Sequence, residues 1–148
     1  MSLLTDSVFI KALKGSAAIS NAVSKRIYGT AIPLPDAQVA NVPLPFIVVS
    51  FEGSQPLPGS KDGDMEGYEM QNTVGVLLVA ATLPALHTLM EAVRSVIADS
   101  MRKVDPESPM FDDYPVDYDC LVPPVEWDPF KPAYHVKFTY VCTVKNNY

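Results

Sequence analysis

Two histidines are the first side chains to weigh as catalytic groups. His87 directly follows Leu86, an apolar position of an expected helix, and His135 lies on the polar side of an expected strand. Nucleophilic catalysis needs a base held against a serine or cysteine by a third group, and no spacing here proposes such a trio. The sequence also lacks a glycine-rich phosphate loop, a Gly-x-Ser-x-Gly elbow and a His-Glu-x-x-His pair. We therefore expect no enzyme, no catalytic residue and no cofactor.

Four aspartates, Asp112, Asp113, Asp117 and Asp119, are the only candidate metal site. Asp117 and Asp119 would lie on one side of a strand, and hard cations bind where several oxygens converge. The order of the four matches no calcium loop, and prolines flank them where such a loop has a tight glycine turn. Pairing with Lys137 across the sheet, or plain solvation, is the reading we favour, with a bound cation as the alternative.

Cys120 and Cys142 are the only cysteines, too few for the disulfide framework of a small secreted domain. Neither belongs to a Cys-x-x-Cys motif or to a Cys/His cluster of the kind that binds zinc. We expect both to be reduced and to lie in the core. The nearby aromatic residues are also typical of a core, although they would suit a binding cage: Tyr118, Trp127, Tyr134, Phe138 and Tyr140.

Composition limits the classes of protein that this chain can be. With 148 residues, 48% of them apolar, residues 1–148 are expected to form a single domain with its own core. A formal charge of −6 argues against specific nucleic-acid binding, which depends on lysine and arginine displacing counterions. The longest apolar runs, 45–51 and 73–83, are too short to span a bilayer, and no signal peptide opens the chain. We expect a soluble protein made in the cytoplasm, with no membrane partner.

The first third of the chain predicts a helix followed by an extended crossing. A helical period of apolar residues runs from Thr5 or Asp6 to Tyr28, with Gly29 suited to the C-terminal position. Gly15-Ser16 interrupts it, which favours two helices with a bend, the second beginning at Ser16. Prolines then exclude a helix between residues 30 and 44, so this segment is expected to be extended and stiff.

The remaining elements are two strand pairs separated by a long helix. Strands are predicted at 46–51, apolar on both faces, and at 68–81, with a hairpin loop over 55–67 between them. A helix capped by Thr82 follows and extends to about Met101. Alternation then predicts strands at 116–122 and 134–144, joined by the segment "PPVEWDPFKP". The order helix, two strands, helix, two strands indicates an α+β domain: an antiparallel four-stranded sheet with two main helices packed on one face.

In this order the chain resembles a family of small tail-completion and tail-terminator proteins of long-tailed bacteriophages and prophages. The resemblance rests on the helix end "AAISNAVSKRIYGTAIP" and the first strand "LPFIVVSFEG". It continues in the second strand and long helix, "TVGVLLVAATLPALHTLMEAVRSVI", and in the last strand, "YHVKFTYVC". The segment 105–132 is longer and richer in proline than the resemblance implies.

The resemblance implies a structural protein that forms rings, commonly hexamers, on the end of the tail tube. Such a ring stops polymerisation of the tube and faces the head connector, so its partners are further copies of itself, the tail tube and head-connector proteins. It would be found in the host bacterial cytoplasm during assembly and then in the tail or neck of the virion. A strand that is apolar on both faces can pack on its helices on one side and on a neighbouring subunit on the other. We expect the interface to include Arg26, Tyr28, Phe46, Val48, Phe51, Val76 and Leu78.

A different class of function stays open. The same arrangement of helices on a sheet could serve a host-encoded domain that binds a small ligand or another protein, with the aromatic residues lining a pocket. Neighbouring genes for tail and connector proteins would favour the phage reading over this one.

Overall fold

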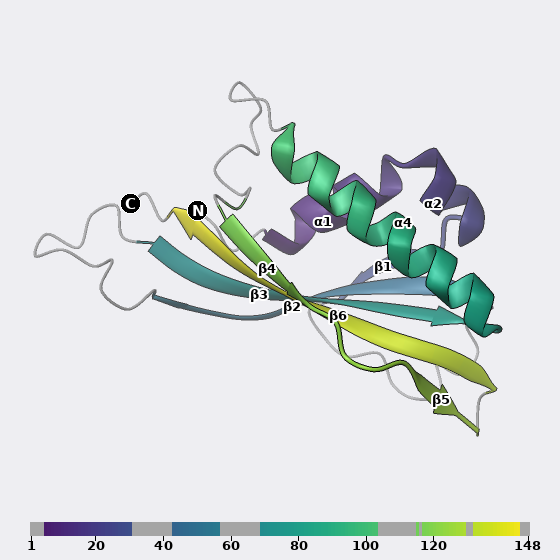
Figure 1. Cartoon of the computed structure of the whole chain (residues 1–148). Coiled ribbons are helices and arrows are strands. Elements are labelled where there is room, and N and C mark those ends of the chain that lie inside the picture. Colours follow the sequence, from purple (N-terminus) through teal and green to yellow (C-terminus); the bar gives the residue numbers. More distant parts are fainter. Residues whose placement is uncertain are drawn as a thin grey trace, which may run out of the picture.

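A twisted sheet carries the described helices on one of its faces (Figure 1). The structure is a computed structural model and describes residues 5–30, 43–56, 69–103, 115, 117–129 and 132–145. In chain order its elements are α1 (Thr5–Lys14), α2 (Ala17–Ala22), β1 (Ile27–Thr30), β2 (Phe46–Pro56), β3 (Glu69–Ala80), α4 (Leu83–Arg102), β4 (Asp117–Leu121), β5 (Glu126–Asp128) and β6 (Ala133–Lys145).

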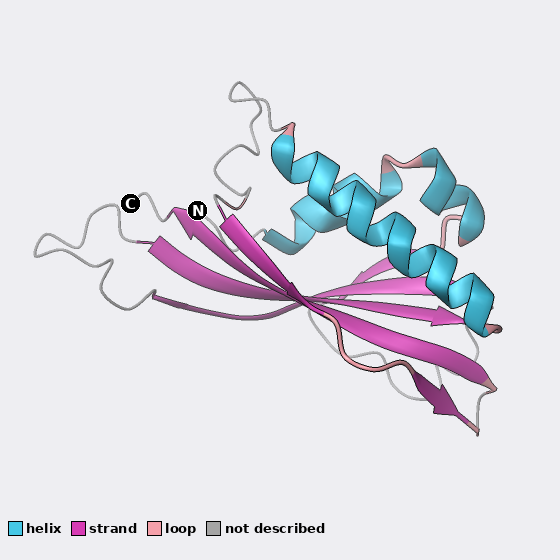
Figure 2. Cartoon of the chain, in the orientation of Figure 1, coloured by secondary structure: helices cyan, strands magenta, loops and turns pink. Residues whose placement is uncertain are grey.

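The six strands form one mixed sheet in the order β1-β2-β3-β6-β4, and β5 also pairs with β6 (Figure 2). Strands β1 and β2 are parallel, whereas the other pairs are antiparallel. The two longest strands, β3 and β6, lie side by side in the centre. Strand β4 pairs with residues 139–143 of β6 and β5 pairs with residues 133–135. Because β3 occupies the other side of β6, β4 and β5 together form one lateral edge of the sheet.

The predicted antiparallel four-stranded sheet with two main helices is wrong, because the described chain has six strands, one parallel pair and three helices. The missed strand β1 begins inside the segment predicted to be helical up to Tyr28 and extends through Gly29 to Thr30, the first residue of the predicted crossing. Helix α2 ends at Ala22, and Ser24 and Lys25 then adopt φ angles of 51° and 65°. This left-handed turn, which costs each non-glycine residue about 1–2 kcal/mol, redirects the chain into an extended conformation.

Gly29 belongs to β1 instead of ending a helix, and its small size has a packing reason. A Cβ atom at this position would lie 2.5 Å from Cδ1 of Ile10 in α1. Glycine therefore lets α1 lie close over the edge strand. The other missed strand, β5, has only three residues, which is too short for alternation to be recognised.

Other predicted elements are confirmed. The break at Gly15-Ser16 is present, and the Ser16 hydroxyl caps α2 by accepting a hydrogen bond from the Ile19 N–H at 3.4 Å. Thr82 caps α4 in the same way, with Pro84 in the first turn. Strand β2 is longer than predicted and extends to Pro56, so Gln55 and Pro56 belong to the strand instead of the expected hairpin loop. Parts of the expected crossing (31–42), of the hairpin loop (57–67) and of the proline-rich segment (105–114, 116 and 130–131) lie outside the described residues.

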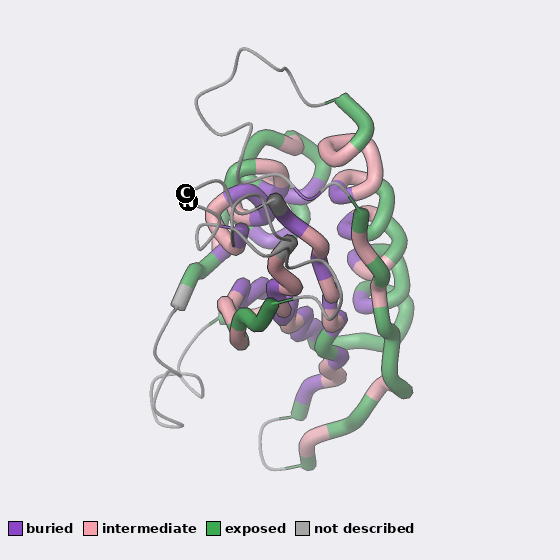
Figure 3. The backbone as a smooth tube through the Cα atoms, turned by 90° about the vertical axis from the view of Figure 1, so that its left-hand side faces the viewer, coloured by how far each residue is buried: buried purple, intermediate pink, exposed green. Residues whose placement is uncertain are grey.

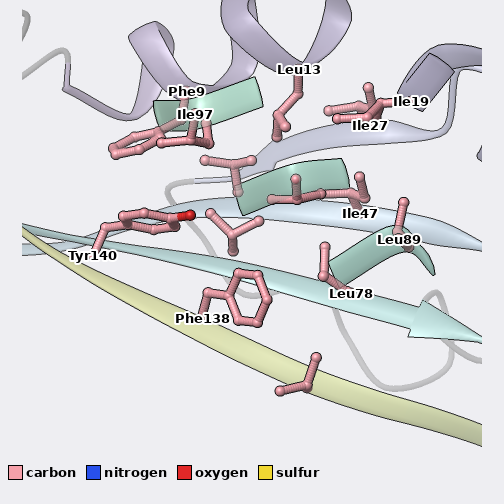
Figure 4. Close-up of a cluster of buried hydrophobic side chains, with 14 of the residues drawn as sticks. Phe9, Leu13, Ile19, Ile27, Ile47, Leu78, Leu89, Ile97, Phe138 and Tyr140 are labelled. Carbon is pink, nitrogen blue, oxygen red and sulfur yellow. The ribbon is translucent and has the colours of Figure 1, made fainter. Parts of the chain in front are cut away.

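The core lies between the helices and the sheet. Alternate residues of β3 and β6 point towards the helices, and the apolar stripes of α1 and α4 point back at them (Figure 4). The Phe9 and Tyr140 rings lie 4.9 Å apart between centroids, which ties α1 to β6. Burial of apolar surface here is the main source of stability. The fully buried members include Phe9, Leu13, Ile19, Ile47, Val76, Leu78, Leu86, Ile97, Phe138 and Cys142.

A buried polar network fixes the start of α1 on the sheet. The Asn72 amide nitrogen donates to the Thr5 hydroxyl at 2.9 Å, and the Ser54 hydroxyl donates to the Asn72 carbonyl oxygen at 2.6 Å. Thr5 and Asn72 are fully buried, so water cannot replace these bonds. One side chain of β3 thus joins β2 to the helix layer.

We predict that Asn72→Ala lowers the free energy of unfolding by about 2–3 kcal/mol, because it leaves a buried hydroxyl without this partner and creates a small cavity. Gln71→Ala is the matched control, since Gln71 is adjacent in β3 and its bond to Gln55 is exposed. It should cost less than about 0.5 kcal/mol. Urea denaturation of both variants measures the difference, and equal losses would contradict the role given to the network.

Candidate interaction surface

The sheet face that bears no described helix, here called the open face, carries its own apolar cluster. It is formed by Phe46 and Val48 of β2, Val79 of β3 and Ala133 of β6, with Leu77 packed against them. These residues alternate with the core residues of the same strands, so they point away from the helices. In Figure 3 the helices show buried positions alternating with exposed ones, and in α4 the buried positions are Leu86, Leu89, Val93 and Ile97. The apolar character of both faces of β2, read from the sequence, therefore divides between the main core and this second cluster.

A cavity of about 360 Å³ opens on the open face, beside β5. Its apolar lining comes from four members of that cluster, from the β4–β5 link and from β6: Phe46, Leu77, Val79, Ala133, Pro123, Pro124 and Val136. Its polar lining comes from Glu126, Asp128, His135 and Lys137. The cavity therefore combines an apolar floor with a charged rim, the usual composition of a site that binds another molecule.

An ion pair crosses the open face beside the cavity. The Lys137 ammonium donates to a Glu52 carboxylate oxygen at 2.6 Å, although β3 lies between their strands. Gly75 of β3 makes this possible, because a Cβ atom there would lie 2.5 Å from the Glu52 carboxylate oxygen. The expected partners of Lys137 were Asp117 and Asp119. Those two are exposed and lie opposite Thr143 and Val141 in the register, so solvation accounts for them.

His135 has a carboxylate neighbour that the sequence analysis missed. Its Nε2 lies 3.3 Å from a Glu126 carboxylate oxygen, across the pairing of β5 with β6. The two residues are nine apart in the chain, and only the β5 strand, which was not predicted, brings them together. The described cavity lining contains no serine, threonine or cysteine that this pair could activate. His87 lies elsewhere, exposed on α4.

The residues expected at an interface lie in different environments. Phe46 and Val48 belong to the open face, and Tyr28, exposed at 36%, alternates with the buried Ile27. Phe51 is half-buried in β2. Val76 and Leu78 are fully buried under the helices, so we do not include them in the surface proposed below.

Arg26 has a structural role at the entry to β2. Its guanidinium donates to the carbonyl oxygens of Pro45 at 3.0 Å and of Leu44 at 3.1 Å. The Ile47 N–H in turn donates to the Arg26 carbonyl at 3.0 Å, where pairing of β1 with β2 begins. Arg26 therefore sets where β2 starts, and with it the position of Phe46.

A second cavity of about 360 Å³ lies on the helix side, between α4 and β4. Burial raises the pKa of the Cys120 thiol and of the Tyr140 hydroxyl, both of which line it, and raises the pKa of the buried Cys142 to about 12. These groups are therefore poor nucleophiles. The expectation that the aromatic residues belong to the core holds for Phe138 and Tyr140, with Tyr118 and Tyr134 packed against it; Trp127 remains 48% exposed.

Neither a metal cluster nor a membrane span is found among the described residues. No group of three or more His, Cys, Asp or Glu side chains converges there, and Asp112 and Asp113 lie outside them. None of the described helices has the length and apolar character that crossing a bilayer requires.

We predict that a thiol reagent at mildly alkaline pH leaves Cys142 unmodified in the folded protein. The thiolate is the reactive form, and a raised pKa keeps the thiol protonated until the pH approaches about 12. Cys120, which is half-buried, should react first but more slowly than free cysteine. Peptide mapping with and without urea measures both rates. Rapid modification of Cys142 without urea would contradict its placement in the core.

Comparison with known proteins shows similarity to solved structures. No protein-family model and no curated protein matches the chain. Among solved structures, it is similar to a chain of the virion of native gene transfer agent (GTA) particle, with a TM-score of 0.61 and 14% sequence identity. The match covers 95% of this chain and 94% of that chain. At this identity the likeness establishes a shared fold, over almost the whole length of both chains.

Proposed function

We propose that the protein is a structural subunit of a phage-like particle, and that it forms a ring on the end of the tail tube as a tail-terminator or tail-completion protein. The observation that carries the proposal is the fold shared with a chain of a gene transfer agent virion over 95% of this chain. Both chains are covered almost entirely, so the matching unit is the small domain itself. The sequence resemblance to tail-terminator proteins supports the finer assignment.

The cavity on the open face supports self-association, while Phe46, Val48, Val79 and Ala133 of the apolar cluster beside it are at most 9% exposed in the single chain. The described helices cover one face of the sheet, and the open face keeps a cavity with an apolar floor. In a ring, each subunit presents two different surfaces, one to each neighbour, and the contact repeats until the circle closes. The sheet ends in β1 on one side and in β4 with β5 on the other, so the two lateral edges carry different side chains. Two unlike surfaces are what such a heterologous contact requires. The partners would then be further copies of the chain, six to a ring if it follows the resemblance, together with the tail tube and head-connector proteins.

A non-enzymatic role fits the described side chains. The Glu126–His135 pair has no hydroxyl or thiol beside it in the described cavity lining, and the thiols of the helix side have raised pKa values. The formal charge of −6 per subunit would give a ring a negative lumen, past which DNA could move without adhering. The proposed location is the host bacterial cytoplasm during assembly and then the tail or neck of the virion.

One observation favours a second candidate, a host-encoded domain that binds a small ligand. The cavity of about 360 Å³ on the open face falls within the usual range for ligand sites, about 300–1,000 Å³. In that case a ligand would fill the cavity in the monomer and no self-association would be needed.

We predict that the purified protein is an oligomer of defined mass at tens of micromolar concentration. Native mass spectrometry and light scattering at physiological salt measure the number of subunits. A closed ring gives one mass that stays constant as concentration rises, because no free edge remains to add subunits. A monomer at every concentration would refute the ring and favour the ligand-binding candidate.

We predict that the double variant His87→Gln with His135→Gln keeps its oligomeric mass and, in a phage setting, its infectivity within a few-fold of the unmodified protein. Glutamine at 135 can still donate to Glu126, and His87 is exposed. Phe46→Asp is the contrasting variant. It places a charge on the cavity floor and should therefore lose the oligomeric mass that the histidine variant keeps. If the histidine variant folds and assembles but loses infectivity, the non-enzymatic assignment fails.

A further inference from the structure

The lateral edge formed by β4 and β5 is acidic. Residues 117–129 contain four carboxylates and no lysine or arginine. Asp117 and Asp119 are exposed on β4, and the Glu126 side chain on β5 is 76% exposed. Glu126 and Asp128 also line the open-face cavity. The acidic edge and the cavity are therefore one continuous surface.

The opposite lateral region, formed by α1, α2 and β1, is basic. Residues 5–30 contain three lysines and one arginine against a single aspartate. Lys14 and Lys25 are exposed, and the backbone of each is hydrogen-bonded to Ser20. The Ser20 hydroxyl donates to the Lys14 carbonyl at 3.2 Å, and the Lys25 N–H donates to the Ser20 carbonyl at 2.8 Å. We call Lys14, Lys25 and the exposed Tyr28 the basic corner.

These two regions lie at opposite ends of the strand order, because β1 is the first strand of the sheet and β4 the last. Two acidic edges repel each other, and so do two basic corners, which disfavours a symmetric dimer through either surface. An acidic edge and a basic corner attract. The charge pattern therefore selects a head-to-tail contact between copies.

Apolar side chains beside the carboxylates give such a contact something to bury. Leu121 at the end of β4 is 57% exposed, and Trp127 in β5 is 48% exposed while its ring stacks on Tyr134 at 4.6 Å. Tryptophan is among the residues that contribute most to binding at interfaces, and charged groups contribute specificity and association rate. Because neighbours in a strand point to opposite faces, Trp127 lies on the helix side of β5, against Tyr134, and Glu126 and Asp128 lie on the open face. The acidic edge therefore offers exposed apolar side chains as well as charged groups.

We propose that the acidic edge, with its cavity, binds the basic corner of a second copy of this chain. This rests on the proposed function, since a ring is built from one such contact repeated. It names the surfaces that meet: the carboxylates Asp119 and Glu126 of one copy and the ammonium groups of Lys14 and Lys25 of the next. Because the pairs are exposed, rising salt weakens the contact.

Two charge-reversed proteins test the pairing. In the first, Lys14→Glu with Lys25→Glu places carboxylates at the contact positions of both regions; in the second, Asp119→Lys with Glu126→Lys places lysines at the contact positions of both, although the acidic edge as a whole becomes neutral. Each alone should associate at least tenfold more weakly than the unmodified protein, measured by light scattering across a dilution series. An equimolar mixture of the two should recover the oligomer, because opposite edges are again available. Arg102→Glu with Lys103→Glu, at the end of α4, makes the same change in net charge as the first variant and should associate normally.

The outcomes separate this inference from the proposed function. If the unmodified protein assembles and either reversal leaves its association unchanged, or if the mixture stays dissociated, the edge pairing is overturned while the ring stands. If the unmodified protein is monomeric at every concentration, the ring itself falls and this contact with it. Circular dichroism confirms folding of each variant. Should a reversal unfold the chain, the neutral pairs Lys14→Gln with Lys25→Gln and Asp119→Asn with Glu126→Gln replace it, with the same weakening expected.

Discussion

The pairing of β3 with β6 is the interaction on which the rest of the structure depends. These strands hold twelve residue pairs in register, from Glu69 with Lys145 to Ala80 with Tyr134. Since side chains alternate along a strand, this register decides which residues the helices must cover and which remain on the open face. A shift of β6 by one residue against β3 would move Phe138 and Tyr140 out of the core that Val76 and Leu78 still face. The helix layer, with Asn72 anchoring the start of α1, is a consequence of that register.

The open face shows how the same alternation builds a second apolar cluster, itself buried, beside a cavity. Its apolar residues gather beside the cavity, and Glu52 and Lys137 cross Gly75 to form an ion pair next to it. The ion pair is partly exposed, so it contributes little to stability. Its effect is to separate the apolar end of the face from the polar residues that follow along β6. The two lateral edges of the sheet carry opposite charge: the edge at β5 is acidic, and the turn before β1 at the other edge is basic.

The sequence predicted the elements with strong periodicity and missed those without it. The α4 stripe, the Ser16 and Thr82 caps and the long strands β2, β3 and β6 all follow from local patterns. Strand β1 was hidden because Ile27 continues the apolar period of α2, and the left-handed turn at Ser24 and Lys25 uses residues that carry no turn signal. Strand β5 is too short to be detected from alternation. The Glu126–His135 contact and the cavity depend on β5, so neither could be predicted from the sequence. Phe46 and Val48 were identified as surface candidates because a strand that is apolar on both faces needs two partners.

The central claim is that copies of the chain meet through the acidic edge of one and the basic corner of the next. Backbone hydrogen–deuterium exchange tests this claim most directly. It should be measured by mass spectrometry on the assembled protein and on the same protein diluted until it dissociates. The account predicts slower exchange on assembly in residues 117–129 and in residues 14–28, with α4 unchanged. Protection confined to α4, with both of those segments exchanging at the same rate in the two states, would contradict it.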